Sequence, residues 1–179
     1  FYRCHRRVVC RDPGGAAGLH LAARAIKAAT AGDAETLAWL CRNGAATGGL
    51  ASMAAQAGHL GCLQALHQLG APLGDDVANY AARNGHLGVL KWAHAMGYRG
   101  FSDFTCSMAA ICGSIECLAW LNAAGCPMGP GACHHAASTG QLKTLKWLRA
   151  QGCPWDRARC YLDTDGPAGP AIRKWISKH

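Results

Sequence analysis

The hydrophobic pattern of the chain repeats about every 27 residues, and two glycines twelve residues apart mark each repeat. The first glycines of successive repeats are separated by 26, 27, 28 and 27 residues. The five pairs are Gly32/Gly44, Gly58/Gly70, Gly85/Gly97, Gly113/Gly125 and Gly140/Gly152, and Ala-Ala stands four and three residues before each first glycine. Glycine adopts the left-handed conformation that ends a helix without a Cβ penalty. Each repeat therefore predicts an alanine-rich helix that stops at the first glycine and a second helix that stops at the second.

The second helix of each repeat carries apolar residues on two sides. A leucine stands five residues after every first glycine, and a tryptophan stands seven residues after it in four repeats out of five. The leucines are Leu37, Leu63, Leu90, Leu118 and Leu145, and the tryptophans are Trp39, Trp92, Trp120 and Trp147. At about 100° per residue the two positions lie about 200° apart, so burying both requires cover from neighbouring repeats. The pattern predicts stacked hairpins with one continuous core, in which the leucines and most tryptophans are buried.

This periodicity predicts an all-α helix–turn–helix solenoid of five to six short repeats, forming a single domain over residues 19–179. The expected units are 19–45, 46–71, 72–98, 99–126 and 127–153, followed by a degenerate C-terminal cap at 154–179. The first helix is expected to run from Leu19 to Ala31. Residues 1–18 form a basic lead-in that we expect to be poorly ordered.

The pattern Ala-Ala-x-x-Gly-His-Leu-x-x-Leu-x-x-Leu-x-x-x-Gly resembles the ankyrin repeat, and residues 80–97 and 135–152 match it well. The Trp-rich segment 146–155 is similar to the short ankyrin variety found in protists, algae and large DNA viruses. Ankyrin repeats usually have about 33 residues, and the residues missing here lie between the second glycine and the next helix, where the family forms β-hairpin fingers. The family's Thr-Pro-Leu-His opening is reduced to its His in residues 129–134. We therefore expect short connecting turns with little or no β-structure.

The net charge of +8 is concentrated at the two ends of the chain. Residues 1–12 carry a surplus of three basic residues and residues 141–179 a surplus of five, while the stretch between them is neutral. Half of the residues are hydrophobic and 16% are charged, which is typical of a folded chain. The basic ends support an alternative function, in which they bind a nucleic acid or another anionic surface.

Most of the eleven cysteines occupy positions that other repeats fill with small residues. One position holds Cys106, Cys133 and Cys160; a second holds Cys62 and Cys117; a third holds Cys126 and Cys153. Exchange with Ala, Val and Thr indicates free, buried thiols. This interpretation predicts an intracellular protein, in the cytoplasm or the nucleus. No apolar run of 18 residues is present that could span a membrane.

The sequence offers no convincing metal, cofactor or catalytic site. No Cys-x-x-Cys pair is present, and the nearest metal candidate is Cys4-His5 with Cys10. His59 and His86 directly follow a first glycine, where the ankyrin family also places histidine. No nucleophile stands in the local setting that catalysis requires. We therefore expect a non-enzyme without cofactor or metal. Because the sequence begins with Phe1 rather than Met, a third hypothesis places a catalytic activity in a longer parent chain.

We predict a non-catalytic protein–protein interaction scaffold or adaptor whose partner is another protein. Contact residues are expected where the repeats differ and where ankyrin proteins commonly bind, namely just before the first glycine and in the connecting turns. The first group is Gln56, Arg83, Asn84, Ile111, Ser138 and Thr139, and the second is Arg99, Phe101, Asp103, Trp155 and Asp156. Trp155 has two interpretations, since it either packs under its turn or serves as an exposed anchor of the kind common at interfaces.

Overall fold

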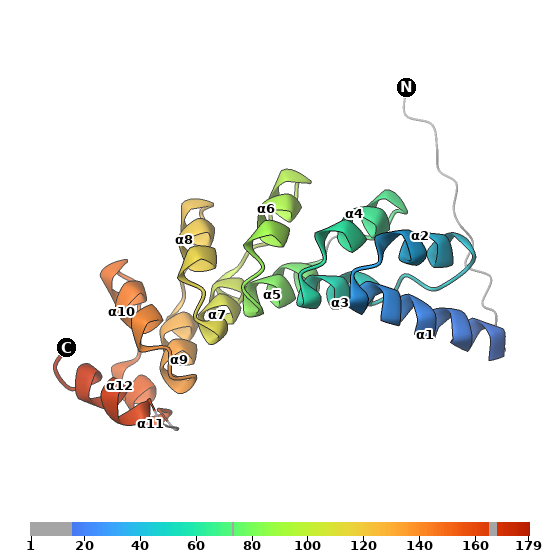
Figure 1. Cartoon of the computed structure of the whole chain (residues 1–179). Coiled ribbons are helices and arrows are strands. Elements are labelled where there is room, and N and C mark those ends of the chain that lie inside the picture. The colour runs from blue at the N-terminus through green and yellow to red at the C-terminus, as the bar shows by residue number, and fades with distance from the viewer. Residues whose placement is uncertain (1–15, 73, 165–167) are drawn as a thin grey trace.

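The structure is a computed structural model that describes residues 16–72, 74–164 and 168–179. Over these residues the chain forms twelve α-helices and no β-strand (Figure 1). The helices are α1 (Ala16–Ala31), α2 (Ala34–Arg42), α3 (Leu50–Ala57), α4 (Leu60–Gln68), α5 (Asp75–Arg83), α6 (Leu87–Ala95), α7 (Asp103–Cys112), α8 (Ile115–Ala123), α9 (Pro130–Ser138), α10 (Leu142–Ala150), α11 (Arg157–Leu162) and α12 (Gly169–Ile176). No helix in the described part is both long and apolar enough to cross a membrane.

The helices form two rows, one of first helices and one of second helices. The first helices, α1, α3, α5, α7, α9 and α11, each pack against the next along the array. The second helices α2, α4, α6, α8 and α10 stand on one side of that row, and those from α6 to α10 fan apart (Figure 1). The predicted all-α solenoid is confirmed. The short connecting turns contain no strand among the described residues, as the length of the repeat predicts.

The glycine pairs end the helices as the sequence predicts. All ten of these glycines are in the left-handed region, with φ between +75° at Gly85 and +99° at Gly44. After α3 the backbone N–H of His59 donates to the carbonyl of Ala54 at 2.9 Å, and that of Gly58 donates to Ala55 at 3.2 Å. This pair of bonds caps the last carbonyls of the helix. The chain can then turn at once into the second helix.

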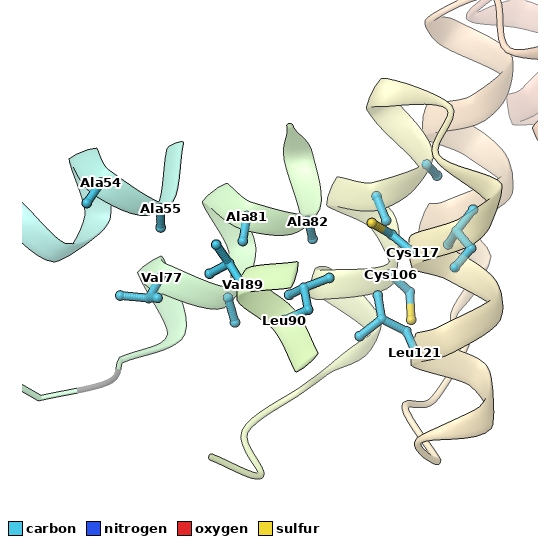
Figure 2. Packing of buried hydrophobic residues seen from close by; sticks show 14 of the residues in the cluster. Ala54, Ala55, Val77, Ala81, Ala82, Val89, Leu90, Cys106, Cys117 and Leu121 are labelled. Atoms are coloured by element: carbon cyan, nitrogen blue, oxygen red, sulfur yellow. The ribbon is translucent and has the colours of Figure 1, made fainter. Parts of the chain in front are cut away.

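The core is continuous along the array and is built from small residues on the first helices and leucines on the second. The alanine pairs of the first helices are almost fully buried, as Figure 2 shows for α3 and α5. Small side chains allow these helices to pack closely. Leu90 and Leu118 have no exposed surface, and the corresponding leucines of the other repeats are equally buried. The predicted leucine core is confirmed.

The prediction that most tryptophans belong to the core holds only in part, because Trp92, Trp120 and Trp147 pack against the core without being fully buried. Trp39 is 52% exposed, and Trp92, Trp120 and Trp147 are only half-buried. The cause is the separation of the second helices, which leaves the flanks of each helix poorly covered. Trp92 gains partial cover from an edge-on contact with His67 of the preceding repeat, at 5.7 Å between ring centroids. No hairpin precedes α2 among the described residues, so Trp39 lacks this cover.

The two ends of the array differ in detail from the predicted units. The first helix begins at Ala16, three residues before the predicted Leu19, so the expected lead-in overlaps a helix. Residues 1–15, the rest of that lead-in, lie outside the described residues. At the C-terminus α11 is only six residues long, and α12 packs against it and against α9. Ile172 and Ile176 of α12 are buried, which completes the core at this end.

Candidate functional site

The first helices expose one face of their own along the whole array, and we call it the first-helix face. At about 100° per residue, positions two, five, six and nine residues before the first glycine lie on the side of the helix opposite the alanine pair. The alanine side is buried against neighbouring helices. In α5 and α7 the opposite side carries Tyr80, which is 37% exposed, and Phe104, which is 53% exposed. This face is therefore a surface on which neighbouring repeats present side chains together.

Large apolar side chains gather on the first-helix face. Eight large hydrophobic residues are clearly exposed in the described part of the chain, and six of them belong to first helices. These six are Leu19, Ile26, Tyr80, Phe104, Tyr161 and Leu162. None of the six was predicted from the sequence, although the position five residues before the glycine varies as strongly as the predicted dipeptides. That position holds Lys27, Met53, Tyr80, Met108 and His135 in successive repeats.

The residues predicted just before the first glycine lie at one edge of this face. Gln56, Arg83, Asn84 and Thr139 are exposed, while Ile111 and Ser138 are half-buried. Three of these side chains bond to their own helix. Asn84 donates to the carbonyl of Tyr80 at 2.9 Å, and Thr139 and Ser138 donate to the carbonyl of His135 at 2.6 and 3.2 Å. These three side chains bond to carbonyls in the last turn of their own helix, α5 or α9. Arg83 and Gln56 make no side-chain hydrogen bond to a described residue.

The residues predicted in the connecting turns lie at the other end of the first helices. A helix of nine residues is about 13 Å long, so the two predicted groups form two separate edges rather than one cluster. Asp103 is exposed at the start of α7, and Asp156 accepts a hydrogen bond from the backbone N–H of Arg159 at 3.0 Å. The carboxylate of Asp156 is thus the N-cap of α11.

Arg99 and Phe101 both contribute contacts that hold one turn together, although Arg99 is exposed. The Arg99 guanidinium donates to the carbonyls of His94 at 2.6 Å and Tyr98 at 3.0 Å. Phe101 is half-buried between the rings of Tyr98 and Trp120, at centroid distances of 5.0 and 5.6 Å. Edge-on contacts of this kind stabilise the turn beyond simple burial. The geometry gives both residues a structural role.

Tyr98 ties this turn to the preceding first helix. Its hydroxyl donates to the Asp75 carboxylate at 2.6 Å and lies 3.0 Å from the carbonyl of Gly100. Burial of the ring, followed by the hydrogen bond to Asp75 and its negative charge, raises the pKa of the Tyr98 hydroxyl. The hydroxyl stays protonated and keeps Asp75 as a fixed acceptor at the start of α5.

Trp155 lies at the mouth of a cationic pocket at the C-terminal end of the array. The Arg149 guanidinium carbon is 4.9 Å from the centre of the Trp155 ring, and the Trp175 ring is 6.0 Å away. Lys146 adds a second positive charge to the lining of this pocket, which also includes His179 and whose volume is about 400 Å³. Trp155 is half-buried. It packs against the cap and also presents part of its surface to a pocket.

No three His, Cys, Asp or Glu side chains in the described ranges come close enough together to hold a metal ion. The nearest approach to a cluster joins α9 and α11, where His134 Nδ1 lies 3.4 Å from a carboxylate oxygen of Asp163. The adjacent His135 ring is 5.2 Å from that of His134, centroid to centroid. Burial, followed by the positive charges of His134 and Arg159, lowers the pKa of His135.

Comparisons with known proteins support the repeat architecture. Residues 51–94 match the sequence family described as ankyrin repeats in many copies. No curated protein matches the sequence. Among solved structures, the human ASB11 ankyrin repeat domain is similar, with a TM-score of 0.66 and 16% sequence identity. The match covers 86% of this chain and 82% of that domain.

Proposed function

Since this chain is an ankyrin-repeat protein, we propose that it is a non-catalytic scaffold that binds another protein along its first-helix face. The observation that carries the proposal is the set of exposed apolar side chains on α1, α5, α7 and α11 of this face. Exposed apolar surface is costly in water, and a contiguous patch of it commonly marks an interaction site. A partner that covers these side chains would remove them from solvent.

Tyr80 and Phe104 are the central residues of the proposed contact. They belong to α5 and α7, which pack directly against each other in the middle of the array. Arg83 lies on the same side of α5 as Tyr80, three residues further along, and supplies a charge at the edge of the patch. A few aromatic and Arg side chains commonly contribute most of the binding energy at an interface. The predicted residues Gln56 and Arg83 keep their proposed role, as flanking contacts.

Replacing both Tyr80 and Phe104 by alanine is expected to raise the dissociation constant of a partner complex at least about tenfold, since interface aromatics commonly contribute 2 kcal/mol or more. The unfolding transition should change little, because both side chains are exposed. The test compares affinity capture by the full chain, by the double variant and by Met96→Ala. Met96 is 48% exposed but lies at the end of α6, away from the first-helix face.

A protein retained by wild type and by Met96→Ala, but lost with the double variant, is then purified and its dissociation constants are measured by calorimetry. Equal binding by wild type and double variant would contradict the proposal. Equal weakening by Met96→Ala would assign the contact to the second helices instead.

The cationic pocket at the C-terminal end favours a second candidate, binding of single-stranded nucleic acid. Such sites combine aromatic faces, on which bases stack, with positive charges that contact phosphates. Trp155 and Trp175 supply the aromatic faces here, and Lys146 and Arg149 supply the charges. The corresponding basic residues at the N-terminus lie outside the described residues.

The second candidate predicts that a labelled oligonucleotide binds at low salt and that Trp155→Ala weakens binding by about 1–3 kcal/mol, the usual contribution of a stacked base. Affinity should fall steeply as salt rises. The measurement is fluorescence anisotropy over a salt series, with Trp39→Ala as the control for losing an exposed tryptophan elsewhere. Absence of binding at low salt would eliminate this candidate.

A further inference from the structure

Two pairs of cysteine side chains meet inside consecutive repeats. Cys106 lies in α7 and Cys126 in the turn after α8, and their sulfur atoms are 3.0 Å apart. Cys133 and Cys153 occupy the same two positions one repeat later, in α9 and in the turn after α10. Both pairs are separated by twenty residues in the sequence. The repeat pattern predicts buried thiols at these positions but does not predict that they pair.

The members of each pair differ in their surroundings. The thiol of Cys106 has no exposed surface and contacts the sulfur of Cys126, and the Cys126 thiol donates to the carbonyl of Ser102 at 3.0 Å, which leaves Cys106 as the donor between the two sulfurs. The hydrogen bond from Cys106 lowers the pKa of Cys126 and raises that of Cys106. Cys126 is 6% exposed at the turn, whereas Cys106 has no exposed surface, so Cys126 is the member closer to solvent.

The second pair occupies the matching positions of the next repeat. Cys133 has no exposed surface, and a hydrogen bond with it lowers the pKa of Cys153. Cys153 is 2% exposed and donates to the carbonyl of Gly129 at 3.4 Å. In both repeats the accepting carbonyl belongs to the residue just before the first helix of the same repeat, Ser102 before α7 and Gly129 before α9. Recurrence at matching positions makes an accidental contact a poor explanation.

We propose that Cys106/Cys126 and Cys133/Cys153 are two dithiol sites that hydroperoxides convert reversibly into intrachain disulfides. A disulfide requires a sulfur–sulfur distance of about 2.05 Å, so the first pair must close by only about 1 Å. The first step gives sulfenic acid on Cys126 and releases one molecule of water or alcohol from the peroxide. The thiol of Cys106 then attacks the sulfenic sulfur, which forms the S–S bond and releases one water. Two electrons pass from the two thiols to the peroxide.

The structural consequence is confined to the fourth and fifth repeats. A Cys106–Cys126 bond joins α7 covalently to the turn that leads into α9, and the second bond joins α9 to the turn that leads into α11. Earlier repeats cannot form these bonds, because the paired positions hold Ala25/Ala45, Ala51/Ala71 and Ala78/Tyr98. Oxidation therefore fixes the connecting turns of one half of the array only. This inference stands independently of the proposed binding function.

The test titrates the reduced full chain with hydrogen peroxide, alkylates the remaining thiols and maps the peptides by mass spectrometry. We expect crosslinked peptides that join Cys106 to Cys126 and Cys133 to Cys153, and their loss on reduction with dithiothreitol. Cys62 is buried without a sulfur among its hydrogen-bond partners, so it should remain alkylable after unfolding and serves as the internal control.

Cys126→Ala should abolish the first disulfide, leave Cys106 alkylable and leave the second disulfide intact, and Cys153→Ala should do the reverse. Alanine is native at this position in the first two repeats, as Ala45 and Ala71, so the fold should accept both variants. The proposal is overturned if both pairs stay reduced at a peroxide concentration that fully oxidises the exposed Cys112. It is equally overturned if the disulfides join other cysteines.

Discussion

Gly58→Ala is expected to lower the free energy of unfolding by about 2–4 kcal/mol, from left-handed strain and a lost hydrogen bond together. The backbone of Gly58 has φ of +76°, which a residue with a Cβ adopts only at a cost. A Cβ built there would lie 2.6 Å from Nδ1 of His86 in the next repeat. His86 must move, and its ring then loses the 3.0 Å contact between Nε2 and the carbonyl of Gln56.

The matched control is Gly70→Ala, which separates strain from displacement. Gly70 has φ of +86°, but no atom lies within 4 Å of its added Cβ. Gly70→Ala should therefore lower the free energy of unfolding only by the left-handed strain, about 1–2 kcal/mol. Urea denaturation of both variants measures the difference. Measured relative to His86→Ala alone, Gly58→Ala should lower the free energy of unfolding by as much as Gly70→Ala does in the wild-type background. A Gly58→Ala variant no less stable than Gly70→Ala would show that the contact between repeats does not constrain this turn.

Leu118→Ala is expected to lower the free energy of unfolding by about 2–5 kcal/mol, the usual range for truncating a fully buried leucine. Leu118 lies in α8 with no exposed surface, in the middle of the array. Its truncation leaves a cavity that the closely packed neighbouring helices fill only in part. The measurement is equilibrium unfolding in urea, followed by circular dichroism.

Trp39→Ala is the informative contrast to Leu118→Ala. The residue is larger, and the sequence pattern predicts it to be buried, yet it is 52% exposed. Its truncation should cost no more than about 1 kcal/mol, because most of its surface is already in water. A loss for Trp39→Ala that equals that of Leu118→Ala would mean that the tryptophans belong to the core after all.

The candidate contact residues could be predicted only in part. Variation between repeats correctly led to exposed positions such as Gln56 and Arg83. It could not separate them from Asn84 and Thr139, whose side chains bond to their own helix. It also overlooked Tyr80, because variability was sought next to the glycine rather than around the whole helix. Side-chain hydrogen bonds depend on rotamers and neighbours that a repeat alignment does not contain.

Local sequence determined the elements of this protein and their repetition. A glycine such as Gly58 ends its helix through its own backbone freedom, and Leu118 lies on the apolar side of its helix through its spacing from Leu121. Both effects act within a few residues of the chain. The all-α solenoid with short turns therefore followed from the sequence.

Only the tertiary structure decided which side chains are covered and which meet. Trp39 is exposed because no hairpin precedes α2 among the described residues, and Cys106 meets Cys126 because a hairpin brings residues twenty positions apart into contact. Tyr80 and Phe104 are exposed on two helices, α5 and α7, that pack side by side. Each outcome depends on the distance and angle between helices. Those quantities are set by packing across whole repeats, not by the residues next to each position.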